Sequence, residues 1–199
     1  MLLMKKIYFI RHGIAQHNIL FKQFGKNAFY DQKYYDTKLT PEGHNQSLRL
    51  GKSWEKINNI DLVLTSSLYR TLETTENIFS NTNVKIIALD ILKEFPQGLH
   101  TCNKRSPKKE LIQRFHTIDF SWIDTENDEM WSNIEEETIE SLNQRINLLN
   151  EFIKTRKEGT IAIITHNSFI GQYINKKINH IENGDQELLH CHPYEINFK

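Results

Sequence analysis

Ile7-Tyr-Phe-Ile-Arg-His-Gly-Ile-Ala-Gln-His-Asn18 is the stretch of this chain from which its fold can be predicted. Residues 7–10 are β-branched or aromatic, a composition typical of a buried strand. The run ends in Arg11-His12-Gly13, which places a cation, an imidazole and a conformationally free residue where the strand gives way to a turn. Ligands of open α/β sheets bind beyond the carboxyl ends of the strands. This stretch alone is compatible with an oxyanion site or with an ordinary polar turn.

Segments that predict strands recur along the chain and are separated by segments with helical periodicity. The predicted strands are residues 7–10, 61–65, 84–89, 160–165 and 187–198, and the predicted helices are 41–57, 68–79, 137–156 and 169–177. The clearest helix is 137–156, in which apolar residues recur at three- and four-residue steps. Strands that alternate with helices indicate a parallel sheet covered on both faces. We therefore expect an α/β fold with three layers, α/β/α, around a mostly parallel central sheet.

Length and composition restrict the class of protein further. The 199 residues suggest a single domain, 1–199, in which the irregular segment 95–133 is an insertion over the active site. The formal net charge is zero, so we expect neither nucleic acid nor a membrane surface as a partner. The chain has two distant cysteines, no signal-peptide pattern and no apolar run of ~20 residues, so we expect a cytoplasmic protein. Composition gives no indication of the oligomeric state.

Three predicted strands end in residues that can bind an anion. The first ends at Arg11-His12, the second is followed by Arg70 in the opening turn of a helix, and the fourth ends at His166. The carboxyl ends of parallel strands lie on one edge, so these four side chains should converge near helix N-termini, which favour anions. Guanidinium groups match phosphate oxygens, and fixed donors stabilise the charge that develops during phosphoryl transfer. We therefore expect a phosphate site that needs no metal and no cofactor.

Arg11-His12-Gly13 after a strand, the Ser-x-x-x-Arg-Thr pattern from Ser66 to Thr71, and Thr165-His166 together resemble the histidine phosphatase superfamily, the phosphoglycerate-mutase-like proteins. The resemblance implies that His12 is a nucleophile that forms a phosphohistidine. It also implies a set of residues that hold the phosphoryl group, namely Arg11, Asn18, Arg70 and His166. The implied substrate is a small phosphorylated molecule.

The same resemblance implies a general acid after the third strand. Glu94 matches that position, and Asp90 is the competing carboxylate. The acid must protonate the leaving oxygen and then activate water. The alternative for Glu94 is a solvated loop carboxylate without a catalytic role.

The segment Gly98-Leu-His-Thr-Cys-Asn-Lys-Arg105 resembles the plant and fungal mutase-like branch of the superfamily. That resemblance implies that Lys104 and Arg105 reach toward the non-reacting end of the substrate. The alternative is that these residues belong to a solvated basic face. Two departures favour a phosphatase over a mutase. Glu94 lacks the Arg-x-Tyr-Gly that follows it in mutases, and the chain is shorter than mutases that hold a bisphosphate.

The leading hypothesis is thus a phosphatase that hydrolyses a phosphomonoester through His12. A phosphoglycerate mutase-type transfer and a catalytically weak phospho-ligand or protein-binding module are the alternatives. His190-Cys-His192, with His180 nearby, could also suggest zinc, but a contiguous cluster without a second spaced pair is a weak signal, and a terminal strand with polar side chains is the favoured interpretation. His17 has no predicted partner, and His100 is expected near the mouth of the pocket.

Overall fold

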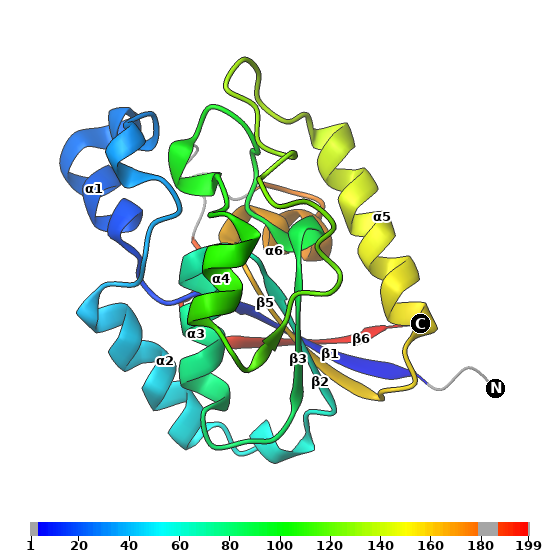
Figure 1. Cartoon of the computed structure of the whole chain (residues 1–199). Helices are drawn as coiled ribbons and strands as arrows, with labels where there is room; N and C mark the ends of the chain where they lie inside the picture. The colour runs from blue at the N-terminus through cyan, green and yellow to red at the C-terminus, as the bar shows by residue number, and fades with distance from the viewer. Residues whose placement is uncertain (1–3, 179–186, 199) are drawn as a thin grey trace.

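The computed structural model describes residues 4–178 and 187–198 of the chain, which form a layered α/β fold (Figure 1). Within these residues the strands make a six-stranded sheet in the order β4-β3-β2-β5-β1-β6. The strands are β1 (Lys5–Arg11), β2 (Leu62–Ser66), β3 (Lys85–Leu89), β4 (Ile118–Asp119), β5 (Thr160–Thr165) and β6 (Pro193–Phe198). All pairs are parallel except β1 with β6, so the predicted mostly parallel sheet is confirmed.

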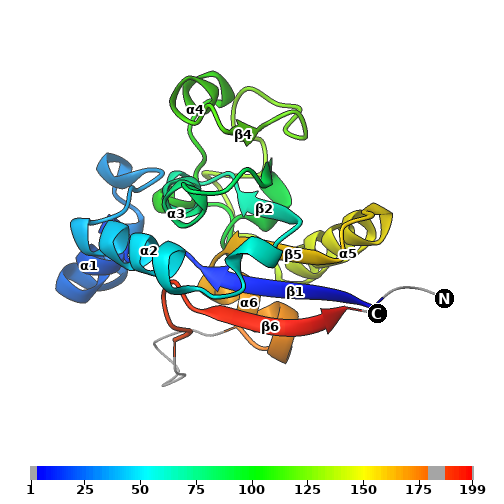
Figure 2. The same ribbon diagram turned by 90° about the horizontal axis from the view of Figure 1, so that it is seen from below.

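Helices cover both faces of the sheet, as Figure 2 shows from below. They are α1 (Gln16–Phe24), α2 (Pro41–Ser53), α3 (Tyr69–Phe79), α4 (Lys108–Arg114), α5 (Ile139–Thr155) and α6 (Asn167–Asn175). Short 3-10 helices include η1 (Gly25–Phe29), η4 (Asp90–Leu92) and η5 (Thr101–Asn103). The predicted helix 41–57 ends earlier, at Ser53, and the predicted strand 187–198 is extended only from Pro193.

Two apolar cores hold the three layers together. Successive side chains of β1 point to opposite faces, so Tyr8 and Ile10 pack with α3 and α4, whereas Ile7 and Phe9 pack with α5 and α6. Phe9 has no exposed surface, and a truncation of such a side chain costs about 3–5 kcal/mol. The sheet is therefore a rigid support for the residues at its carboxyl edge.

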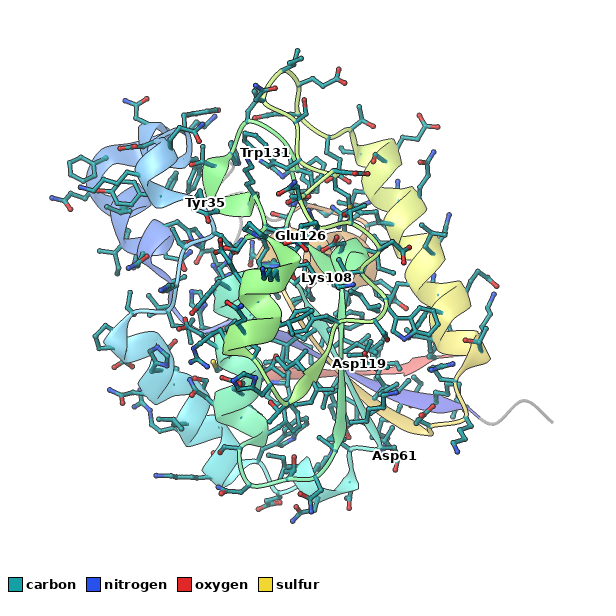
Figure 3. The ribbon with its side chains drawn as sticks, in the orientation of Figure 1. Tyr35, Asp61, Lys108, Asp119, Glu126 and Trp131 are labelled. Carbon is teal, nitrogen blue, oxygen red and sulfur yellow. The ribbon has the colours of Figure 1, made fainter. Side chains whose placement is uncertain are left out.

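The chain between β3 and α5 is fastened to the sheet by buried charges. Lys93, directly after η4, forms a completely buried ion pair with Asp128. Asp128 also accepts a hydrogen bond from the backbone N–H of Arg105 (2.7 Å). Farther out, the backbone N–H of Lys108 donates to the carbonyl of Glu126 (2.8 Å), and the two residues lie side by side in Figure 3. These bonds connect successive parts of the segment to one another and to the residues that follow β3.

In the described ranges 4–178 and 187–198, no helix combines the length and the apolar character needed to cross a membrane.

Candidate active site

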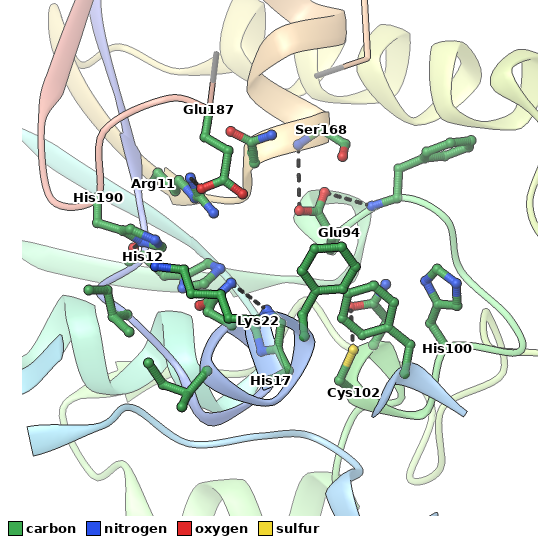
Figure 4. A pocket seen from close by; sticks show the side chains of 18 of the residues that line it. Arg11, His12, His17, Lys22, Glu94, His100, Cys102, Ser168, Glu187 and His190 are labelled. Atoms are coloured by element: carbon green, nitrogen blue, oxygen red, sulfur yellow. Dashed lines mark hydrogen bonds and ion pairs between the residues drawn. The ribbon is translucent and has the colours of Figure 1, made fainter. Parts of the chain in front are cut away.

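The ends of β1, β2 and β5 bring the two predicted histidines together. The backbone N–H of His12 donates to the carbonyl of Thr165 (3.0 Å), so the two strands end at the same level. The ring centroids of His12 and His166 are 5.1 Å apart, and Nε2 of His166 lies 2.9 Å from Oγ of Ser66. A cavity of about 400 Å³ opens in front of this edge, and His12 lines it (Figure 4).

Backbone geometry fixes which nitrogen of His12 is free. Nδ1 lies 2.7 Å from the carbonyl oxygen of Gly13. A carbonyl only accepts, so Nδ1 carries the proton and Nε2 keeps its lone pair. Gly13 itself is required by space, because a Cβ there would lie 2.5 Å from the carbonyl oxygen of Gly43. Burial, and then the charge of Arg70, lower the pKa of His12 well below its usual value, so the ring stays neutral near pH 7.

Arg70 and His166 lie immediately behind the cavity rather than in its lining. Arg70 is fully buried, and its Nη1 and Nη2 donate to the carbonyl of Cys102 (2.7 Å) and to Oδ1 of Asn103 (2.9 Å). Within the described part of the chain, Nε of Arg70 and Nδ1 of His166 are buried without a hydrogen-bond partner. Buried polar atoms of this kind are normally paired, so both are available to a bound group.

Arg11 lines the cavity and is already paired with a carboxylate. Its Nη1 donates to Oε2 of Glu187 (3.0 Å) and to the carbonyl of Leu188 (2.7 Å). The Arg11 side chain is 3% exposed, whereas that of Glu187 is 37% exposed. Figure 4 shows the Glu187 carboxylate beside the guanidinium, on the cavity side. A carboxylate thus occupies a place where another anion could bind.

The structure separates the two candidate acids. Glu94 lines the cavity, and its Oε1 accepts a hydrogen bond from the backbone N–H of Phe95 (2.8 Å). Burial raises the pKa of Glu94, which favours the protonated form that an acid needs. Asp90 instead lies 3.1 Å from Nε of Arg105 and accepts a hydrogen bond from the hydroxyl of Ser67. Of the two carboxylates, Glu94 is the one that lines the cavity.

Asn18 lines the cavity from the start of α1. Its Oδ1 accepts a hydrogen bond from the backbone N–H of Ala15 (2.9 Å), which leaves the amide nitrogen 3.2 Å from Nε2 of His17. His17 had no predicted partner, yet it is buried with its ring centroid 5.7 Å from that of His12. The short spacing from His12 was the one signal in the sequence for this proximity.

His190 is a second cavity residue without a predicted role. Its Nδ1 lies 2.5 Å from the backbone oxygen of His12, and the two ring centroids are 5.5 Å apart. Burial lowers the pKa of His190 to about 4. No cluster of three or more histidine, cysteine or acidic side chains suited to a metal occurs in the described residues, and His180 lies outside them. Of the segment His190-Cys-His192, the imidazole of His190 lines the cavity.

Neither Lys104 nor Arg105, which were expected to reach toward the non-reacting end of the substrate, lines the cavity. Arg105 is 1% exposed, and its guanidinium donates to backbone carbonyls of its own segment, those of Ser106, Thr125, Glu126 and Asn127. Lys104 places Nζ 4.6 Å from the ring centroid of Trp131. The alternative of a solvated basic face is wrong for Arg105, because its guanidinium is buried and hydrogen-bonded within the protein. His100, as expected, does line the cavity.

Comparison with known proteins assigns the chain to a family. The family model of the histidine phosphatase superfamily (branch 1) matches residues 7–197. Phosphoglycerate mutase-like protein 1 of Arabidopsis thaliana is 29% identical over 219 residues, covering 95% of this chain and 74% of the relative. The plant branch proposed from residues 98–105 is consistent with this match.

Solved structures share the fold. Phosphoserine phosphatase from Entamoeba histolytica, in complex with 3-phosphoglyceric acid, superposes with a TM-score of 0.59 at 22% identity, covering 96% of this chain and 90% of that one. Alpha-ribazole phosphatase from Shigella flexneri superposes with a TM-score of 0.57 at 19% identity, covering 86% and 78%.

Proposed function

This chain belongs to the histidine phosphatase superfamily, and from that premise we propose that it hydrolyses a phosphomonoester through a phosphohistidine on His12. The observation that carries the proposal is the bond from Nδ1 of His12 to the carbonyl of Gly13, which leaves Nε2 free beside the cavity. A neutral imidazole with a fixed tautomer is a competent nucleophile.

In the first step Nε2 of His12 attacks phosphorus and the bond from phosphorus to the leaving oxygen breaks. Glu94, whose pKa is raised by burial, gives its proton to that oxygen and the alcohol departs. In the second step the Glu94 carboxylate takes a proton from water while the water oxygen attacks phosphorus and the bond between phosphorus and Nε2 of His12 breaks. Inorganic phosphate and the neutral imidazole are regenerated, and Glu94 is again protonated.

The charge that builds on the phosphoryl oxygens needs fixed donors. Arg11 lines the cavity, and Nε of Arg70 is buried and unpaired behind it. Guanidinium donors held in place before the reaction stabilise the transferring group without reorganisation. Asn18 and His166 add polar atoms at the same end of the cavity. These side chains supply the positive charge, so the proposed mechanism uses no cofactor.

The test is to measure hydrolysis of p-nitrophenyl phosphate and, in samples quenched with alkaline detergent because a phosphohistidine is hydrolysed in acid, the phosphate attached to the protein. We expect His12→Ala to lose both. His116→Ala, a change at an exposed histidine outside the cavity, is the matched control and should keep both. Full hydrolysis by His12→Ala contradicts the proposal. Faster transfer of the trapped phosphate to 3-phosphoglycerate than to water would favour the mutase, and phosphate binding without turnover would favour a binding module.

A further inference from the structure

The outer part of the cavity is aromatic rather than charged. Phe21 of α1 and Phe29 of η1 line it with their rings stacked, 5.1 Å between centroids and 8° between planes. Phe95 and Pro96 line it from the segment that follows Glu94. In Figure 4 the Glu94 carboxylate lies between the Arg11 end of the cavity and the end where His100 and Cys102 are labelled. The cavity thus has a charged end and an apolar end.

This apolar end begins next to the reacting groups. Ring contacts lead outward from His12 to His17 (5.7 Å) and from His17 to Phe29 (6.3 Å). Phe95 donates its backbone N–H to Glu94, so its side chain is anchored beside the acid. If His12 holds the phosphoryl group and Glu94 protonates the leaving oxygen, the rest of the leaving group must lie among these side chains.

The cavity lining has few cations that could neutralise a second negative charge on the leaving group. Arg11 is already paired with Glu187, and Glu94 and Glu187 add two carboxylates to the lining. Lys22, the other lining residue with a fixed positive charge, is exposed, and such a cation contributes little. Lys104 and Arg105, the cations expected at this end, face other partners.

We propose that the substrates are phosphomonoesters of uncharged alcohols that carry an aromatic ring, with that ring seated against Phe21 and Phe29. The proposal rests on the hydrolytic function proposed above and names its substrate class. A cavity of about 400 Å³ has room for a ring of this size. The reaction takes up one water and releases the alcohol and inorganic phosphate, with the proton on the alcohol supplied by Glu94.

Two synthetic substrates isolate the effect of charge. 2-Phenylethyl phosphate and 2-(4-carboxyphenyl)ethyl phosphate release alcohols of the same type, so they differ at the ring end and not in leaving ability. Moving a carboxylate from water onto phenyl rings is costly, so kcat/KM should be at least about tenfold higher for the uncharged compound. 3-Phosphoglycerate, which has a carboxylate and no ring, should be poorer still.

Variants of the stacked pair assign the preference to these rings. Phe29→Ala should lower kcat/KM for 2-phenylethyl phosphate about tenfold and leave the carboxylated compound nearly unchanged. Phe29→Lys should reverse the preference, a result that a merely structural role would not give. Phe24→Ala is the matched control, since Phe24 is the last residue of α1, directly before η1, is 56% exposed and does not line the cavity. Thermal melting of each variant checks that it is folded.

The outcomes separate this inference from the proposed function. Equal turnover of both phenylethyl compounds, or preference for the carboxylated one, overturns the inference while hydrolysis through His12 stands. No turnover of any phosphomonoester overturns the hydrolytic function. The matching phosphonates then still test the pocket by calorimetry, because tighter binding of the uncharged phosphonate supports the apolar compartment and equal binding rejects it.

Discussion

The Glu187 carboxylate sits on the Arg11 guanidinium, so Glu187→Gln should strengthen the binding of inorganic phosphate. Phosphate that approaches Arg11 must displace a neighbouring carboxylate or share the cation with it. Both costs disappear when the side chain is a neutral amide. The pair joins Nη1 of a nearly buried arginine to Oε2 of a partly exposed glutamate at 3.0 Å.

The size of the effect follows from that distance. Two unit charges 3.0 Å apart interact by about 5.5 kcal/mol at an effective dielectric constant of about 20, and by about 1.4 kcal/mol in water. Because the Glu187 side chain is 37% exposed, solvent screens the pair, and its interaction energy lies near the lower of these two values. A change of about 1.4 kcal/mol is tenfold in a dissociation constant. We therefore expect the inhibition constant of phosphate to fall about tenfold.

The assay is competitive inhibition of p-nitrophenyl phosphate hydrolysis by inorganic phosphate, with titration calorimetry as a direct check. Glu151→Gln is the control, because it removes the same charge from an exposed pair with Lys154 on α5. It should leave the inhibition constant unchanged. An unchanged constant in Glu187→Gln would refute the reasoning. A higher constant would show that Glu187 orients Arg11 for phosphate instead of competing with it.

Three further outcomes follow from buried charges. Burial raises the pKa of Glu94, so the buried carboxyl group destabilises the fold once the pH is high enough to ionise it. Glu94→Gln should therefore melt about 2–4 °C higher than the native protein at pH 7 and no higher at pH 4. The same variant should have a greatly reduced kcat. Burial lowers the pKa of His12, so the acid limb of the kcat/KM profile should lie well below pH 6.5, and a limb centred at 6.5 contradicts this. Lys93→Met leaves Asp128 unpaired inside the protein and should cost about 3–5 kcal/mol in urea unfolding. The exposed Lys154→Met should stay within about 0.5 kcal/mol.

Local signals were sufficient for the five predicted strands and for the residues at their ends, but not for β4, which lies in the segment 95–133 that was predicted to be irregular. A continuous apolar run such as 160–165 has few alternatives to a buried strand, and parallel strands must end on one edge. That reasoning places His12 and His166 together without any knowledge of side-chain packing. Glu94 followed from family resemblance, and the structure separates it from Asp90 by the partner each one has.

The contacts that depend on pairing between distant segments could not be predicted from the sequence. The segment before β6 reaches the cavity only because β6 pairs with β1, and this brings Glu187 and His190 to Arg11 and His12. Nothing near residues 187–190 in the sequence signals that contact. The partners of Arg105 could not be predicted for a related reason. They are backbone carbonyls about twenty residues later, and backbone carbonyls leave no mark in the amino-acid sequence.

The antiparallel direction of β6 has a practical consequence. Pro193 pairs with Ile10 beside the cavity, whereas Phe198 pairs with Lys5 at the other end of β1. The start of β1 and the end of β6 therefore lie side by side, at the opposite end of β1 from Arg11, and Figure 1 shows these two strand ends together. A linker attached at either end would anchor the protein to a bead or a sensor chip with the cavity turned toward the solution. The protein could then be screened against phosphorylated ligands on a surface without obstruction of its pocket.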